Sequence, residues 1–236
     1  MSFDLRLGDC LDPVTGLALL PDRSVDHVIC DPPYEAEAHT KGRRARAAGG
    51  GEIYNETPLD FVAITDNERI RAGAELARVA CRWILVFCQV EAAMKWRAAL
   101  ETREVGYVRT CVWTKPDATP QFTGDRPGMG YESIVVCHRA GKKRWNGGGT
   151  RGVFEFSGDR DREHMTQKPV ALMEKLVRLF TDPGDTILDP FAGSGTTGVA
   201  AIRLGRKFIG WERDPRYHAI AMKRIRAARE QLELCA

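Results

Sequence analysis

One stretch of the 236-residue sequence fixes an acid and an aromatic ring in a rigid frame, DPPY at residues 31–34. An alternating apolar run over residues 25–30 precedes it and predicts a buried strand. Because proline fixes φ and has no N–H group, the two prolines end that strand and hold Asp31 and Tyr34 at its end. The stretch is therefore either part of a chemical site or a turn that only ends a strand.

A second stretch has the spacing of a nucleoside-binding turn. Between a predicted strand and a predicted helix, the glycines of residues 193–198 fit the pattern G-x-G-x-x-G. Without Cβ atoms the backbone can approach a ligand closely, and the first N–H groups of the helix face it. The next predicted strand ends at Glu212, which is placed to accept hydrogen bonds from two ribose hydroxyls. A tight turn without a ligand is the alternative, but the order of these elements favours a nucleoside cofactor.

The position of the glycine turn in the chain indicates how the sheet is completed. Only 38 residues follow Gly198, enough for one helix, one strand and a final helix, so earlier strands must complete the sheet. Ligands of open α/β sheets bind at the carboxyl ends of the strands, where the strand order reverses. We therefore expect Asp31 and Tyr34 to face the same crevice as the glycine turn.

The elements that position these residues alternate along the chain. Strand patterns occur at residues 3–7, 25–30, 82–88, 106–114, 131–138, 184–189 and 206–211, and helical patterns at 67–80, 90–101, 169–181, 195–204 and 214–233. This alternation predicts an α/β fold with a mostly parallel, doubly wound sheet. No helical pattern separates the strands 106–114 and 131–138, so these predict an antiparallel pair at one edge.

Three segments break the alternation: 35–57, 115–130 and 139–163. They are rich in glycine or in basic residues, and each by itself is typical of a solvated loop. The net charge of +3 hardly favours nucleic acid over other partners. Three such segments around one predicted site nevertheless favour a polyanion as the partner.

The cysteines and the hydropathy favour a cytoplasmic protein. The seven cysteines form no C-x-x-C pair, which suits reduced thiols better than disulfides or a zinc site, so we expect no metal. The charged first residues do not fit a signal peptide, and no apolar run approaches the ~18 residues of a membrane span. We therefore expect no membrane partner.

Four motifs together resemble one known family. DPPY at 31–34, TQKP at 166–169, DPFAGSGTT at 189–197 and the acid Glu212 occur in the order of the beta group of amino-methylating DNA methyltransferases. The resemblance runs from about residue 8 to Tyr217. It implies a Rossmann-like S-adenosylmethionine-dependent methyltransferase fold with small irregular target-recognition inserts. The chain would then be one methyltransferase domain over residues 1–236, with target-recognition segments at 35–57 and 115–163.

The resemblance also implies a reaction. The Asp31 carboxylate and the Pro32 carbonyl would accept both hydrogens of an exocyclic base amine, which would free its lone pair for in-line attack on the methyl group. Pro33 would help to hold that frame, and Tyr34 would stack on the base after it has been flipped out of the duplex. Methylation at carbon 5 of cytosine needs a thiolate nucleophile, which in the family with that activity typically follows a proline. None of the seven cysteines of this chain follows a proline, so we do not expect that reaction.

Further site residues follow by position. The cofactor would be contacted by Asp9, Cys10, Asp31, Thr166, Gln167, Lys168, Asp189, Phe191, Ala192, Gly193, Ser194, Gly195, Thr196 and Glu212. The nucleic acid would be contacted by Lys41, Arg43, Arg44, Arg46, Lys142, Lys143, Arg144 and Trp145. Trp113 and Trp211, on predicted strands, are expected in the core.

Several alternatives stay open. The leading hypothesis is transfer to N6 of adenine in DNA, because family members that act on cytosine N4 more often begin the motif with serine where this chain has Asp31. Cytosine N4, an RNA substrate, a catalytically silent nucleic-acid-binding regulator and a dinucleotide oxidoreductase are the alternatives. A homodimer and a separate restriction endonuclease chain are compatible with the sequence, which does not define the recognition site.

Overall fold

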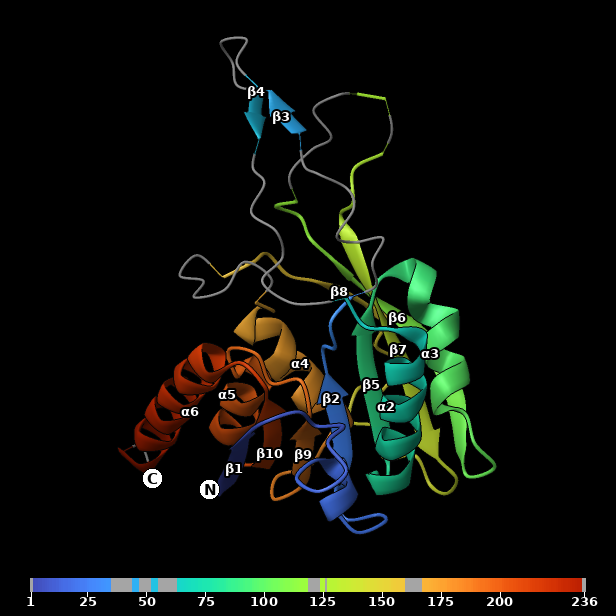
Figure 1. Ribbon diagram of the computed structural model, residues 1–236, viewed down its shortest axis with the longest axis vertical. Helices are drawn as coiled ribbons and strands as arrows, with labels where there is room; N and C mark the ends of the chain where they lie inside the picture. Colours follow the sequence, from blue (N-terminus) through green and yellow to red (C-terminus); the bar gives the residue numbers. More distant parts are fainter. Residues whose placement is uncertain are drawn as a thin grey trace.

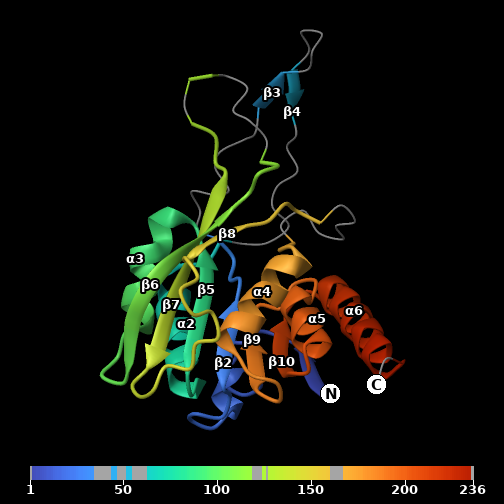
Figure 2. The same ribbon diagram turned by 180° about the vertical axis from the view of Figure 1, so that it is seen from behind.

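The computed structural model describes residues 2–34, 44–46, 52–54, 63–118, 124–125, 127–159 and 167–234, with 44–46 and 52–54 described as backbone only. Eight of its strands form one sheet in the order β1 (Phe3–Leu7), β10 (Lys207–Glu212), β9 (Thr186–Asp189), β2 (His27–Cys30), β5 (Trp83–Cys88), β7 (Tyr131–Arg139), β6 (Val105–Thr114) and β8 (Val153–Glu155). Within this sheet β7 alone runs against both of its neighbours (Figure 2). The predicted mostly parallel sheet is confirmed.

The position of the antiparallel pair differs from the prediction. β6 and β7 pair antiparallel as expected, but β8 pairs in parallel with the outer side of β6 and forms the edge. A three-residue strand in a charged, glycine-rich context carries too little apolar pattern to be predicted. Within the segment 35–57, β3 (Arg44–Arg46) and β4 (Glu52–Tyr54) form a separate antiparallel pair.

Helices cover both faces of the sheet. One face holds α2 (Asp66–Val79) and α3 (Ala93–Leu100), together with the short helices η1 (Leu17–Leu19) and η2 (Val90–Ala92). The other face holds α4 (Val170–Phe180), α5 (Thr196–Arg203) and α6 (Pro215–Leu234) (Figure 1). All five predicted helices are present. No helix in the described part of the chain is long and apolar enough to cross a membrane.

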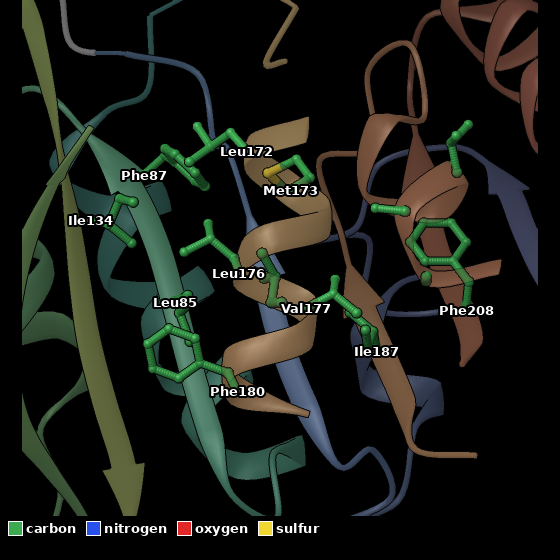
Figure 3. Packing of buried hydrophobic residues seen from close by; sticks show 14 of the residues in the cluster. Leu85, Phe87, Ile134, Leu172, Met173, Leu176, Val177, Phe180, Ile187 and Phe208 are labelled. Atoms are coloured by element: carbon green, nitrogen blue, oxygen red, sulfur yellow. The ribbon is translucent and has the colours of Figure 1, made fainter. Parts of the chain in front are cut away.

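α4 packs against the middle of the sheet and follows the TQKP motif directly. Its residues Leu172, Leu176 and Phe180 recur at every fourth position and face β5, with Leu172 beside Phe87 and Phe180 beside Leu85 (Figure 3). Burying one such side chain stabilises the fold by roughly 1.5–3 kcal/mol. Packing in the core therefore fixes the position of α4, and with it the position of Pro169 directly before the helix.

The reversal of strand order lies between β9 and β2. The chain passes from β2 through α2 to β5 on one side, and from β9 through α5 to β10 on the other, so the two connections diverge from this point. α2 begins with a capping box in which Thr65 and Glu68 exchange hydrogen bonds. Just before it, Ile64 N donates to the Tyr34 carbonyl at 3.2 Å, which joins the end of the DPPY motif to the residues before α2.

Candidate active site

A pocket of about 240 Å³ opens at the carboxyl edge of the sheet. Six acids line it, with Lys168 and Arg213 as the cations. Four of the acids come from strand ends: Asp9 after β1, Asp31 after β2, Asp189 at the end of β9, and Glu212 at the end of β10. Parallel strands place these side chains together although they are distant in sequence. The structure thus brings the DPPY motif and the glycine turn to one crevice, as the sequence predicts.

The glycine turn is held against α6 and β10. Gly195 has φ +80°, and a Cβ there would lie 2.8 Å from the Cβ of Ala221 on α6, so only glycine fits. Arg224 of α6 donates to the Ser194 carbonyl at 2.7 Å. Glu212 Oε2 accepts from Gly193 N at 2.7 Å, which orients the carboxylate beside the turn.

The charges of the pocket select among nucleoside ligands. Asp189 is almost completely buried, and burial raises its pKa to about 7, although Thr197 and Phe191 N donate hydrogen bonds to it. Glu212 and Asp31 add further negative charge near it. A ligand with a cationic centre fits a pocket in which six acids outnumber the cations Lys168 and Arg213, whereas the pyrophosphate of a dinucleotide would be repelled by Asp189 next to the glycine turn. The residues therefore fit a cationic nucleoside and argue against a dinucleotide.

Asp31 is paired on one oxygen and unpaired on the other. Its Oδ2 accepts a hydrogen bond from Lys168 Nζ, whereas Oδ1 is buried without a hydrogen-bond partner among the described residues. Burial raises the pKa of Asp31 more than Lys168 lowers it. An unpaired buried carboxylate oxygen is costly unless a ligand supplies the donor, so Oδ1 is available to bind an N–H group.

Tyr34 is held by a hydrogen bond to a residue that does not line the pocket. Its hydroxyl donates to Glu132 at the start of β7, and Glu132 also accepts from Lys115, which follows β6. Lys168 Nζ lies 3.2 Å from Glu132 Oε2. Sequence analysis missed Glu132 and Lys115. Because β7 runs antiparallel, its first residues, rather than its last, lie at the carboxyl edge of the parallel strands. The only sequence signal for Glu132 is a glutamate at the start of a predicted strand, within GYES at 130–133.

Most of the predicted cofactor residues that the structure describes line the pocket: Asp9, Cys10, Asp31, Gln167, Lys168, Asp189, Phe191, Ala192, Gly193, Ser194, Thr196 and Glu212. Thr166 lies outside the described residues. Gln167 Oε1 accepts from the Ser194 hydroxyl at 3.2 Å, which joins the TQKP motif to the glycine turn. Burial and the nearby Asp9 raise the pKa of the Cys10 thiol, so this thiol is neutral and not a nucleophile.

The structure corrects the placement of the second basic group. Lys142, Lys143, Arg144 and Trp145 follow the end of β7, which lies at the amino edge of the parallel strands, opposite the pocket. There the Arg144 carbonyl accepts from Trp83 Nε1 at 2.6 Å, and the Trp145 ring packs on Phe180 with 4.9 Å between centroids. These residues do not border the candidate site. Lys41 and Arg43 lie outside the described residues, and of Arg44 and Arg46 only the backbone is described.

The expected core tryptophans are confirmed, since Trp113 and Trp211 are both buried. None of the described cysteines forms a disulfide. Among the described residues, no group of His, Cys, Asp and Glu side chains is arranged to hold a metal ion.

Comparison with known proteins agrees with this site. A family model for DNA methylases matches residues 25–223. The type II methyltransferase M2.DpnII of Streptococcus pneumoniae is 48% identical over 91% of this chain and 87% of its own length. The type II methyltransferase M.HinfI of Haemophilus influenzae is 27% identical over 93% of this chain and 67% of its own length.

Solved structures share the fold. The M1.HpyAVI–SAM complex superposes with a TM-score of 0.70 at 25% identity, covering 94% of this chain and 99% of that one. The cytosine-N4-specific PvuII DNA methyltransferase superposes with a TM-score of 0.68 at 17% identity, covering 98% and 92% of the two chains. Because the family model spans the DPPY motif, the glycine turn and Glu212, the chain belongs to the N6/N4 DNA methylase family.

Proposed function

We propose that this protein transfers a methyl group from S-adenosylmethionine to the N6 amine of adenine in DNA. The observation that carries the proposal is Asp31 Oδ1, a buried carboxylate oxygen that has no hydrogen-bond donor among the described residues and belongs to the lining of a pocket with six acids. The acids suit a cofactor with a sulfonium and an ammonium group. The relatives that are type II methyltransferases support DNA as the substrate.

Each part of the pocket has a role in this reaction. When bound, S-adenosylmethionine supplies an electrophilic methyl group. Glu212 accepts hydrogen bonds from the ribose hydroxyls, and the glycine turn forms the wall against which the nucleoside lies. Asp189 and Asp31 supply negative charge for the cationic end of the cofactor.

Asp31 and its neighbours act on the target base. Asp31 Oδ1 and the Pro32 carbonyl accept the two amine hydrogens, which withdraws the nitrogen lone pair from the ring and aims it at the methyl group. The Tyr34 ring stacks on the flipped base while its hydroxyl is held by Glu132. Adenine is favoured over cytosine because the motif begins with Asp31 instead of serine.

The wider arrangement belongs to the same proposal. Residues 1–236 form one methyltransferase domain that acts in the cytoplasm, and the segments 35–57 and 115–163, apart from the stretch 142–145 at the opposite edge, read the target sequence. A homodimer and a separate endonuclease chain as partners are compatible with this reading.

Product analysis tests the proposal. Unmodified DNA is incubated with labelled S-adenosylmethionine, and the nucleosides are separated. Labelled N6-methyladenine is expected with the wild-type protein and not with Asp31→Ala. Label at cytosine N4 would overturn the choice of base. No product on DNA or RNA, with the cofactor still bound, would instead indicate a nucleic-acid-binding regulator.

A further inference from the structure

Two acids share one buried lysine in the lining of the candidate site. The Lys168 side chain is only 5% exposed, and its ammonium contacts both Asp31 and Glu132. Glu132, at 12% exposure, is held in addition by Lys115 and by the Tyr34 hydroxyl. The group therefore contains two carboxylates and two ammonium ions, so its charges balance within the protein.

Aromatic rings close the space around the shared ammonium. Lys168 Nζ lies 5.3 Å from the ring centroid of Tyr34, 5.4 Å from that of Phe87 and 6.0 Å from that of Trp113. Little water is available to replace a lost partner at 5% exposure. The position of the ammonium is therefore set by the two carboxylates that attract it.

Glu132 thus competes with Asp31 for the N–H groups of Lys168. In the structure Lys168 occupies Asp31 Oδ2 and reaches Glu132 with another N–H, which leaves Asp31 Oδ1 unpartnered among the described residues. Without the charge of Glu132, the ammonium would turn fully to Asp31 and would compete with the target amine for its oxygens. The Tyr34 hydroxyl would also lose a charged acceptor.

We infer that Glu132 is a positioning residue for methyl transfer: by sharing Lys168 and holding the Tyr34 hydroxyl, it keeps Asp31 Oδ1 free for the target amine. This inference rests on the proposed function, because it assigns Asp31 as the acceptor. A purely structural role for Glu132, as the anchor of Lys115 and Lys168, is the alternative.

The charged and titratable groups that face Asp31 come from several elements. They are Lys168 before α4, Glu132 on β7, Tyr34 after β2, Cys30 on β2 and Asp189 on β9. Among them Glu132 raises the pKa of Asp31 by its negative charge, whereas Lys168 lowers it. Removing the charge of Glu132 should therefore lower the pKa at which Asp31 becomes ionised and active.

The test compares Glu132→Gln and Glu132→Asp with the wild type. For Glu132→Gln we expect kcat to fall on the order of 10²-fold, since a misaligned acceptor has effects of this size. The KM for S-adenosylmethionine should change little, because Glu132 does not line the cofactor pocket. The acid limb of the kcat–pH profile should move to lower pH, and Glu132→Asp should recover part of the rate.

Controls separate the outcomes. Glu101→Gln makes the same change in an exposed ion pair with Arg97 at the end of α3, away from the pocket, and should retain wild-type kcat. Thermal unfolding and cofactor binding establish that Glu132→Gln is folded. A kcat within about twofold of wild type, or a lower kcat with an unmoved acid limb, would overturn the inference while leaving the proposed function intact. A wild-type protein that forms no methylated product would overturn both.

Discussion

Lys168 Nζ donates a hydrogen bond to Asp31 Oδ2. Lys168 lies two residues before the start of α4, and Asp31 directly follows β2. α4 is anchored in the core by its apolar face, and the strand before Asp31 lies in the middle of the sheet. The acid of the candidate site and its partner therefore lie within two residues of a strand and a helix that the core anchors. This arrangement satisfies the demand for a fixed acceptor that in-line transfer to an amine makes.

Replacing Lys168 by methionine should destabilise the fold in a pH-dependent way. The change keeps an apolar stem of similar length but leaves two largely buried carboxylates without their shared cation, a loss of about 3–5 kcal/mol near pH 8. Because burial raises the pKa of Asp31, this acid takes up a proton as the pH falls, and the loss should shrink at lower pH. Urea unfolding at about pH 8 and at a lower pH measures the difference. Lys175→Met, at an exposed position on α4, is the matched control, and an equal loss at both pH values would contradict this explanation.

Asp189 should make stability fall as the pH rises. Its folded pKa is raised from 3.8 to about 7 by burial, so between these values the folded state binds a proton that the unfolded state has lost. The free energy of unfolding should decrease from about pH 4 to about pH 7, and this contribution should be level above that. Asp189→Asn keeps an acceptor for Phe191 N and should flatten the slope. If urea unfolding gives wild type and variant the same slope, Asp189 is not the titrating group.

The same group should couple cofactor binding to pH. A cationic cofactor favours ionised Asp189, so the affinity of the wild-type protein for S-adenosylmethionine should rise as the pH rises through about 7. This rise should be absent in Asp189→Asn. Calorimetric titration at several pH values measures it. An affinity that is equally pH-dependent in both proteins would assign the effect to another acid.

The elements and the pocket could be predicted from the sequence where local patterns define them. Apolar periodicity gave the strands that end at Asp31, Asp189 and Glu212, and parallel pairing places strand ends together. Glu132 could not be found in this way, because its position depends on the reversed direction of β7 and its partners Tyr34 and Lys115 come from other elements. Contacts between distant elements have no local signal in the sequence.

The basic segment after β7 shows the same limit. Charge composition suggested contact with a polyanion for the residues 142–145, and composition says nothing of the edge at which a loop emerges. The direction of β7 places them opposite the pocket, where Arg144 pairs with Asp182 at 3.0 Å. The loops that border the site are those at the other ends of the same strands.

A side chain at Gly195 should weaken cofactor binding. An alanine Cβ would lie 2.8 Å from Ala221 Cβ, and the residue has φ +80°, which costs a non-glycine residue about 1–2 kcal/mol. The turn would have to move away from α6, and with it the N–H groups that face the ligand. We expect an affinity for S-adenosylmethionine lower by on the order of tenfold in Gly195→Ala by calorimetric titration. Gly149→Ala, where nothing lies near the added Cβ, should bind like wild type; equal affinities for all three would show that the turn does not contact the cofactor.

Neutralising Lys142 and Lys143 should leave DNA binding almost unchanged. Both lie at the amino edge of the parallel strands, opposite the pocket, so a duplex whose target base enters the pocket should not gain phosphate contacts from them. Each phosphate contact that a protein makes adds about 0.9 to the slope of log K against log salt concentration. The double variant Lys142→Ala/Lys143→Ala should therefore keep the wild-type slope in fluorescence-anisotropy titrations with a short unmodified duplex. Lys115→Ala removes a positive charge just after β6, at the edge where the pocket opens, and the same titration with this variant tests that side of the protein. A slope that falls by one to two units in the double variant would mean that DNA reaches the amino edge as well.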